Sequence, residues 1–219
     1  MMSSAAADGR QLVLIFDMDG TLLDTETVKL AAFRDAFAPL CAGNHRSLAA
    51  VHEYNAAHRG VPRDAKFRHV LAMLGAPEGE LAAVAGRYAD LLADRLPSCQ
   101  PLPGVAGFLK AVPAVRFVAS SAPRAEIVDN LTRHGLDAAF TDFYGHPWSK
   151  EQALLDVARR HPTAARVFFG DAPADLAAAR ATRTRFMAIN PNPQPEPLTP
   201  DQARDFQDVG ALAEFLRDG

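Results

Sequence analysis

Short apolar runs recur along the chain, each followed by polar or turn-forming residues. A continuous apolar run of this length is typical of a strand that is buried on both faces of a parallel sheet. The sequence predicts such strands at residues 12–17, 115–120, 166–170 and 185–189, with a shorter candidate at 140–144.

Stretches with helical patterning separate the later strands. Gly135 follows the first of these stretches, as is common just past the end of a helix. Strands and helices in alternation imply right-handed crossovers and a parallel sheet covered on both faces. The predicted helices span 123–134, 149–160 and 173–181, followed by a proline-rich surface loop at 190–200 and a last amphipathic helix at 209–216.

The interval 25–99 breaks this alternation. It is rich in Ala and Leu and shows no strand signal. About seventy helical residues between two strands are far more than a crossover needs. The sequence therefore predicts an α/β core formed by 1–24 and 100–219, with an inserted helical subdomain at 25–99. The breaks between its helices lie near Gly43, 60–62 and 75–77.

The first predicted strand leads directly into the run Asp17-Met18-Asp19-Gly20-Thr21. Open α/β sheets bind ligands at the carboxyl ends of their strands. Two carboxylates this close repel each other unless a cation or a proton lies between them. Aspartate oxygens suit Mg²⁺, an ion that also accompanies phosphate substrates. The run therefore indicates a metal site, with a plain polar turn as the alternative.

Other polar residues follow the later strands. Ser120 and Ser121 precede a helix, where a hydroxyl and free backbone N–H groups can bind an anion; capping of the helix by Ser121 is the alternative. Lys150 stands in a first helical turn, where its charge opposes the helix dipole. It either binds a phosphate group or is a solvated surface lysine. Asp171 and Asp175 lie four residues apart, a spacing that in a helical turn places both on one side. Their alternative role is to complement the helix dipole.

Composition narrows the class of protein. The chain has 219 residues, of which 48% are hydrophobic and 22% charged, as in ordinary globular proteins. A net charge of −3 gives no reason to expect nucleic acid or an anionic membrane as a partner. Residues 1–10 lack the apolar stretch of a signal peptide, and the two cysteines lie far apart. We expect a cytoplasmic protein, either a monomer or a homodimer.

An acid pair, a serine, a lysine and a second acid pair follow one another at four strand ends. This order resembles the haloacid dehalogenase superfamily over most of the chain. The resemblance implies a Rossmann-like core and identifies 25–99 as the helical cap of the subclass with phosphoglycolate phosphatase and β-phosphoglucomutase. It further implies Mg²⁺-dependent chemistry on a small phosphorylated metabolite, through an aspartyl phosphate.

The resemblance also implies a role for each residue. Asp17 would attack phosphorus, and Asp19 would protonate the leaving oxygen and later activate water. Mg²⁺ would be held by the Asp17 carboxylate, the Asp19 backbone carbonyl and Asp171, with Asp175 in support. The phosphate-binding residues that the resemblance implies are Asp17, Gly20, Thr21, Ser120, Ser121 and Lys150.

Residue choices distinguish the activities within this family. Dehalogenases lack the second acid of the first motif, so Asp19 argues against that reaction. A Schiff base, as in phosphonoacetaldehyde hydrolases, would need Lys29 or Lys66, which qualify by residue type alone. Residues 60–64 are similar to the β-phosphoglucomutase loop whose arginine grips a second phosphate, so Arg63 is either a substrate ligand or a solvated side chain.

Two further positions favour a phosphatase over a mutase. Gly170 stands where those mutases carry an acid, and Lys29 stands where they carry a histidine. A mutase and a non-catalytic binding protein remain the alternatives. The basic residues around the loop favour an anionic phosphomonoester, a sugar phosphate or a phosphoglycolate-like acid, unless they form a solvated helix face. They are Arg59, Arg63, Lys66 and Arg68.

Overall fold

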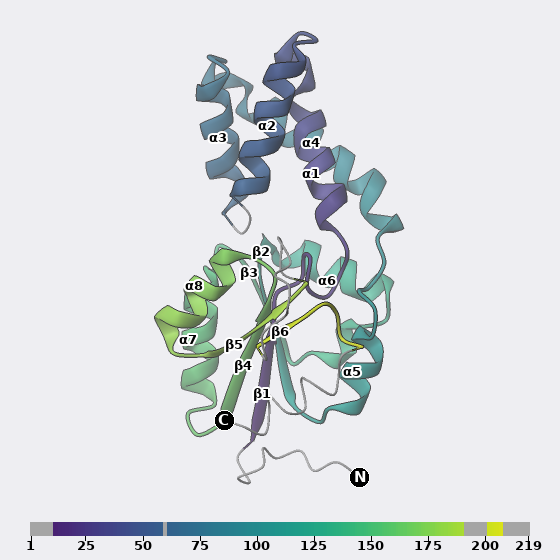
Figure 1. Cartoon of the computed structure of the whole chain (residues 1–219), viewed down its shortest axis with the longest axis vertical. Coiled ribbons are helices and arrows are strands. Elements are labelled where there is room, and N and C mark those ends of the chain that lie inside the picture. Colours follow the sequence, from purple (N-terminus) through teal and green to yellow (C-terminus); the bar gives the residue numbers. More distant parts are fainter. Residues whose placement is uncertain (1–10, 59–60, 191–200, 208–219) are drawn as a thin grey trace. The chain divides into compact units, whose positions relative to one another are not determined.

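The computed structural model describes residues 11–58, 61–190 and 201–207. The chain divides into two compact units, one formed by 1–24 with 100–219 and the other by 25–99. The first unit is called the core below, and the second, which contains helices α1 to α4, is called the insert. Each is described by itself, and Figure 1 labels the elements of both.

The core holds a six-stranded sheet in the order β3-β2-β1-β4-β5-β6, with every neighbouring pair parallel. This confirms the predicted α/β fold. The strands are Leu12–Phe16 (β1), Val115–Pro123 (β2), Asp142–His146 (β3), Ala165–Gly170 (β4), Arg185–Ile189 (β5) and Gln202–Ala203 (β6).

Helices cover both faces of the sheet, with α7 and α8 on one side and α5 and α6 on the other (Figure 1). All of β1 is buried, as the unbroken apolar run predicts for a central parallel strand. Its side chains alternate between the two layers: Leu14 and Phe16 pack toward α5 and α6, and Val13 and Ile15 toward α7 and α8. These helices are Val105–Ala111 (α5), Arg124–Arg133 (α6), Lys150–Arg160 (α7) and Pro173–Thr182 (α8).

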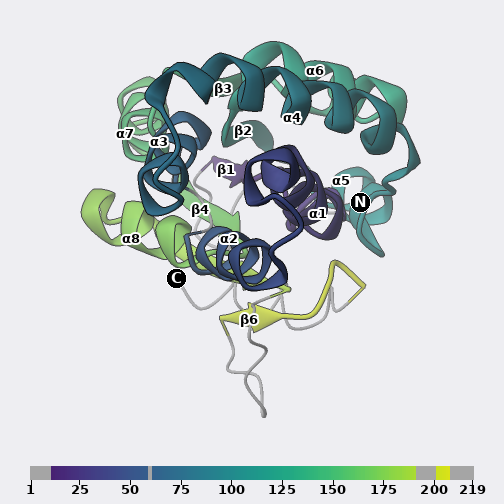
Figure 2. The same cartoon turned by 90° about the horizontal axis from the view of Figure 1, so that it is seen from above.

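The described residues of the insert form helices joined by short turns, with no strand among them, as the Ala- and Leu-rich composition predicts. Phe33, Phe37, Phe67 and Tyr88 form the centre of its separate apolar core. Helices α1 and α2 lie side by side (Figure 2), and Asn44 caps α2 with hydrogen bonds from two backbone N–H groups. The helices are Glu26–Phe37 (α1), His45–Ala57 (α2), Arg63–Met73 (α3) and Leu81–Arg95 (α4).

The two chain connections to the insert leave the core next to each other. The backbone N–H of Asp24 donates to the carbonyl of Gln100 at 2.9 Å, and that of Leu102 donates to Leu22 at 3.0 Å. Because Leu22 follows β1 by only a few residues, these two core segments lie next to the run that starts at Asp17.

Several element boundaries differ from the sequence prediction. The short strand predicted at 140–144 lies instead at Asp142–His146, because the residues before it form a tight helical turn at Asp137–Ala139. Helix α5 and strand β6 were not predicted, since seven and two residues are too few for a periodic signal. The helix predicted at 209–216, and the loop at 190–200 apart from Asn190, lie outside the described residues.

Candidate active site

Strand register brings the polar residues at the strand ends together. Phe16, the last residue of β1, pairs with Val118 of β2 on one side and with Phe169 of β4 on the other. Asp17 follows at once, and its backbone N–H donates to the Phe169 carbonyl at 2.8 Å. The residues that continue β2 and β4 therefore emerge on either side of Asp17, at the edge of the sheet where parallel strands present ligand-binding groups.

A tight turn after Asp17 carries the second acid of the run. The Gly20 N–H donates to the Leu23 carbonyl at 2.8 Å, and the Leu23 N–H donates to the Met18 carbonyl at 3.0 Å. Gly20 has a φ of +78°, in the left-handed region that strains residues with a side chain. The glycine thus lets the chain turn back directly above the strand, with the half-buried Asp19 on the turn.

Lys150 contacts two of the acids with a side chain that is almost completely buried. Ser149 caps the start of α7 through a capping box with Gln152, which places Lys150 in the first helical turn. The Lys150 side chain is 9% exposed; its Nζ lies 3.1 Å from Asp17 Oδ1 and donates a hydrogen bond to Asp175 Oδ1. The alternative of a solvated surface lysine is therefore wrong, and two carboxylates offset its unfavourable position at the helix dipole.

Asp175 is fully buried and has two structural partners. Its Oδ1 accepts from Lys150, and its Oδ2 accepts from the Ala172 N–H at 3.1 Å, at the start of α8. Asp175 therefore also fills its alternative role, that of an acid at a helix start, because it accepts a hydrogen bond from a backbone N–H at the start of α8. In the sequence, Gly170 stands out only because mutases carry an acid at this position. The structure shows that a Cβ there would lie 2.5 Å from the Asp175 Cβ and 2.7 Å from its Oδ2.

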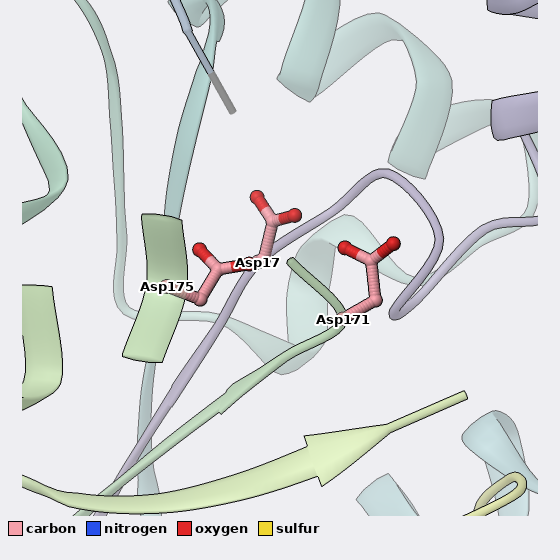
Figure 3. A group of neighbouring side chains, drawn as sticks. All are labelled: Asp17, Asp171 and Asp175. Atoms are coloured by element: carbon pink, nitrogen blue, oxygen red, sulfur yellow. The ribbon is translucent and has the colours of Figure 1, made fainter. Parts of the chain in front are cut away.

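Three buried carboxylates meet at this edge of the sheet. Asp17, Asp171 and Asp175 offer oxygens that all lie within 4.8 Å of one another, and Asp17 lies between the other two in Figure 3. Hard carboxylate oxygens at this spacing suit Mg²⁺. Both oxygens of Asp175 accept hydrogen bonds, so the chain itself holds this carboxylate in place.

The electrostatics of the cluster favour a bound cation. Burial raises the pKa of Asp17 well above its ordinary value, and the charges of Asp175, Asp171 and Asp19 raise it further, against the opposing effect of Lys150. Burial alone lowers the pKa of the Lys150 ammonium, but the charges of Asp17 and Asp175 outweigh it, so that the net shift is upward. One ammonium among four carboxyl groups leaves negative charge that a divalent ion would offset.

The serines at the end of β2 lie in an irregular segment of the strand. Ser120 is buried, and its Oγ accepts from the Ala122 N–H at 3.2 Å. Ser121 does not cap α6, because Pro123 occupies the cap position and no side chain accepts there. The alternative role for Ser121 is thus wrong. Thr21, on the neighbouring turn, is fully buried, and its Oγ1 has no hydrogen-bond partner among the described residues.

The basic residues of the insert differ in their surroundings. Arg63 opens α3, half-buried, with its guanidinium 5.3 Å from the centroid of the Tyr88 ring, so it is not simply solvated. Lys66 donates to Asn55 Oδ1 at 2.7 Å, and Arg68 is exposed and paired with Glu78. Arg59 lies outside the described residues.

Comparisons with known proteins agree on one family. The family model described as haloacid dehalogenase-like hydrolase matches residues 14–189. A search of curated protein sequences gives no match. No helix in the described parts of the chain combines the length and apolar character needed to cross a membrane.

Solved structures share the fold at low sequence identity. A predicted phosphoglycolate phosphatase from Haemophilus somnus 129pt aligns with a TM-score of 0.73 at 16% identity, covering 97% of this chain and 99% of that one. A haloacid dehalogenase-like family hydrolase from Streptococcus pneumoniae gives 0.68 at 19% identity, covering 98% and 100%. A predicted phosphatase from Clostridium acetobutylicum gives 0.64 at 16% identity, covering 81% and 84%.

Proposed function

The chain belongs to the haloacid dehalogenase-like hydrolase family, and we propose from its site that it is a Mg²⁺-dependent phosphatase of small phosphomonoesters. The observation that carries the proposal is the buried Asp17 carboxylate, which directly follows the central strand and lies close to both Lys150 and Asp171. A buried carboxylate next to an ammonium and to a second acid that could bind a metal is arranged for attack on a negatively charged group.

Asp17 is the proposed nucleophile. One of its oxygens attacks phosphorus, the bond from phosphorus to the ester oxygen breaks, and an aspartyl phosphate forms. Asp19, half-buried on the turn above the strand, donates a proton to the leaving oxygen. It then takes a proton from the water that attacks the aspartyl phosphate, which releases inorganic phosphate and restores Asp17.

The remaining core residues bind and orient the phosphoryl group. Asp17, the Asp19 backbone carbonyl and Asp171 would hold Mg²⁺, which when bound supplies positive charge between the nucleophile and the phosphoryl oxygens. Lys150 fixes the Asp17 carboxylate and offers an ammonium to those oxygens, while Asp175 holds Lys150 in place. The phosphoryl oxygens would also accept from the hydroxyls of Thr21, Ser120 and Ser121. Gly20, also indicated by the sequence, would act through the turn it forms, because its N–H already donates to the Leu23 carbonyl.

The insert is proposed to act as a cap that selects the substrate. Arg63 would bind a second anionic group of the substrate, such as the carboxylate of a phosphoglycolate-like acid or a polar group of a sugar phosphate. The Tyr88 ring beneath its guanidinium restricts the directions that the side chain can take. The proposed physiological partner is a small phosphorylated metabolite, and the proposed location is the cytoplasm.

A phosphatase is favoured over a sugar-phosphate mutase by the surroundings of Gly170. Those mutases carry an acid at this position, whereas here the space next to Gly170 is filled by the Asp175 side chain, with its Cγ 2.6 Å from where a Cβ would lie. A further carboxylate at position 170 would therefore displace the acid that holds Lys150.

Phosphate release from a panel of phosphate esters with Mg²⁺ tests the proposal. Wild type should release phosphate, and Asp17→Asn should lower kcat by at least about a thousandfold because the nucleophile is lost. Arg63→Ala should raise KM for the preferred substrate and leave a small generic ester unaffected, whereas Arg68→Ala, on the exposed Glu78 pair, should change neither.

Three results would contradict the proposal in different ways. Full activity of Asp17→Asn would show that Asp17 is not the nucleophile. Equal effects of Arg63→Ala on both esters would show that Arg63 does not recognise the substrate. Conversion of a sugar phosphate without phosphate release would identify a mutase.

A further inference from the structure

Strand β2 leaves its pairing with β3 at the residues that carry the proposed phosphate ligands. Ala119 pairs with Tyr144, but the next pair is Pro123 with His146. Four steps along β2 (119 to 123) thus match two steps along β3 (144 to 146), so β2 has two extra residues here. Such a bulge re-aims the groups it contains. The segment 120–122, called the serine bulge below, lies within it.

Gly145 of β3 lies opposite the serine bulge, and the backbone there approaches it too closely for a side chain. A Cβ on Gly145 would lie 2.6 Å from the Ala122 carbonyl oxygen and 2.5 Å from the Arg124 backbone nitrogen. Both atoms belong to the main chain and cannot rotate away as a flexible side chain would. Any residue other than glycine therefore forces the serine bulge or β3 to move.

The same glycine begins the turn that leads to the lysine. The Trp148 N–H donates to the Gly145 carbonyl at 3.0 Å, and Ser149 then caps α7 and presents Lys150. Gly145 therefore contacts the serine bulge on one side and starts the lysine turn on the other. No catalytic side chain is involved, which explains why no sequence pattern indicates this role.

We propose that Gly145 is a positioning residue that sets the distance between the serine bulge and Lys150, and thereby the site for the phosphoryl oxygens. The proposal rests on the phosphatase function above. Moving the bulge shifts the Ser120 hydroxyl and the Ser121 backbone N–H group, whereas Asp17 and Asp171 directly follow β1 and β4, which pair with each other and not with β3. Phosphate recognition and metal binding should thus respond differently to a change at position 145.

Gly145→Ala is the test variant, and Gly107→Ala in α5 is the matched control because a Cβ there meets no atom within 4 Å. Both are measured below their unfolding temperatures for KM, kcat, inhibition by inorganic phosphate and Mg²⁺ binding by calorimetry. We expect Gly145→Ala to weaken phosphate inhibition and raise KM by about tenfold or more, with Mg²⁺ affinity in the absence of phosphate within about twofold of wild type. Gly107→Ala should match wild type throughout.

A measurement on the wild type guards against a variant that does not fold. Trp148 is the single tryptophan of the chain and is hydrogen bonded to Gly145. Its fluorescence should change as inorganic phosphate is titrated with Mg²⁺, with a midpoint equal to the phosphate inhibition constant. Phosphate inhibition that leaves the fluorescence unchanged would overturn the proposed connection between the phosphate site and the turn that begins at Gly145.

The possible failures are distinguishable. Equal phosphate inhibition of Gly145→Ala and Gly107→Ala, with an active wild type, overturns the role of Gly145 alone. A parallel loss of Mg²⁺ and phosphate affinity also overturns it, because it indicates general disruption of the site. An inactive wild type that releases no phosphate from any ester overturns the proposed function itself.

Discussion

The Nζ of Lys150 lies 3.1 Å from the Oδ1 of Asp17, and both side chains are almost completely buried. The same ammonium binds Asp175, so one positive charge from α7 links the acid at the end of β1 to an acid in the first turn of α8. A buried ion pair is costly to form and still more costly to break on one side. This connection therefore affects stability as well as the proposed chemistry.

Lys150→Met should destabilise the protein by about 3–5 kcal/mol at neutral pH, because it leaves buried carboxylates without their partner. Asp175→Asn should cost less, since the amide still fills the space and can still accept from the Ala172 N–H. In a double-mutant cycle followed by urea unfolding, the Lys150→Met and Asp175→Asn effects should couple by about 1–3 kcal/mol. Additive effects would show that the two side chains do not stabilise each other.

Gly170→Ala should disturb Asp175 by steric contact alone, because alanine adds no charge. The added methyl would lie 2.5 Å from the Asp175 Cβ, so the acid must shift from the position in which it binds Lys150. We expect a loss of about 1–3 kcal/mol in stability, as for other overpacked sites. In the proposed phosphatase, kcat should fall about tenfold or more because Lys150 loses its support.

The control for this variant is Gly86→Ala in α4, where a Cβ meets nothing within 4 Å. It should keep full activity and match or exceed wild type in stability, since alanine favours helix more than glycine does. Wild-type kinetics for Gly170→Ala would mean that Asp175 tolerates displacement.

Acid should weaken the structure partly through Asp142, at the start of β3. Burial raises its pKa, but the Phe143 N–H and the guanidinium groups of Arg124 and Arg160 outweigh burial and hold the pKa below its usual range. A depressed folded-state pKa contributes stability above the unfolded value of about 3.9 and loses it as pH falls through the folded value.

Asp142→Asn should therefore be less stable than wild type by about 1 kcal/mol at pH ~7, a modest amount because these groups are partly solvated. The difference should shrink as pH falls below about 4, where the wild-type carboxyl group also becomes neutral. Urea unfolding at both pH values checks this, with the exposed Asp129→Asn as a control. A difference that grows toward low pH would contradict the sign of the shift.

Much of the site could be predicted because its chemistry directly follows apolar runs in the sequence. Asp17 comes directly after a run that is buried along its whole length, and Asp171 and Lys150 likewise begin turns or helices next to strands. In a parallel sheet these ends meet at one edge, so local patterns alone indicate proximity. The predicted sheet and helical insert follow from the same periodicities.

What the sequence could not show depends on contacts between distant residues. The burial of Lys150 depends on Asp17 and Asp175, from two other elements, and nothing in its own turn distinguishes it from a surface lysine. The close approaches at Gly145 and Gly170 are set by backbone and side-chain positions in three dimensions. Strand β6 is too short for any pattern, and the parallel pairing of its residues with β5 identifies it only in the structure.

Phe206, three residues beyond β6, should nevertheless be among the most important side chains for stability. It is fully buried, and its ring centroid lies 5.1 Å from that of Phe108 and 6.0 Å from that of Phe169. Its backbone N–H also donates to the Pro103 carbonyl at 3.1 Å. This hydrogen bond joins the segment after β6 to the core segment that follows the insert in sequence.

Phe206→Ala should lower the free energy of unfolding by about 3–5 kcal/mol, because it opens a cavity within an aromatic cluster. The exposed Leu155→Ala, in α7 of the same unit, should change it by no more than about 0.5 kcal/mol. Urea unfolding followed by circular dichroism measures both. Because Phe206 packs beneath Phe16, whose next residue is Asp17, the variant should also lower kcat in the folded enzyme. A cost below about 1 kcal/mol for Phe206→Ala would show that this segment does not contribute to the core as described.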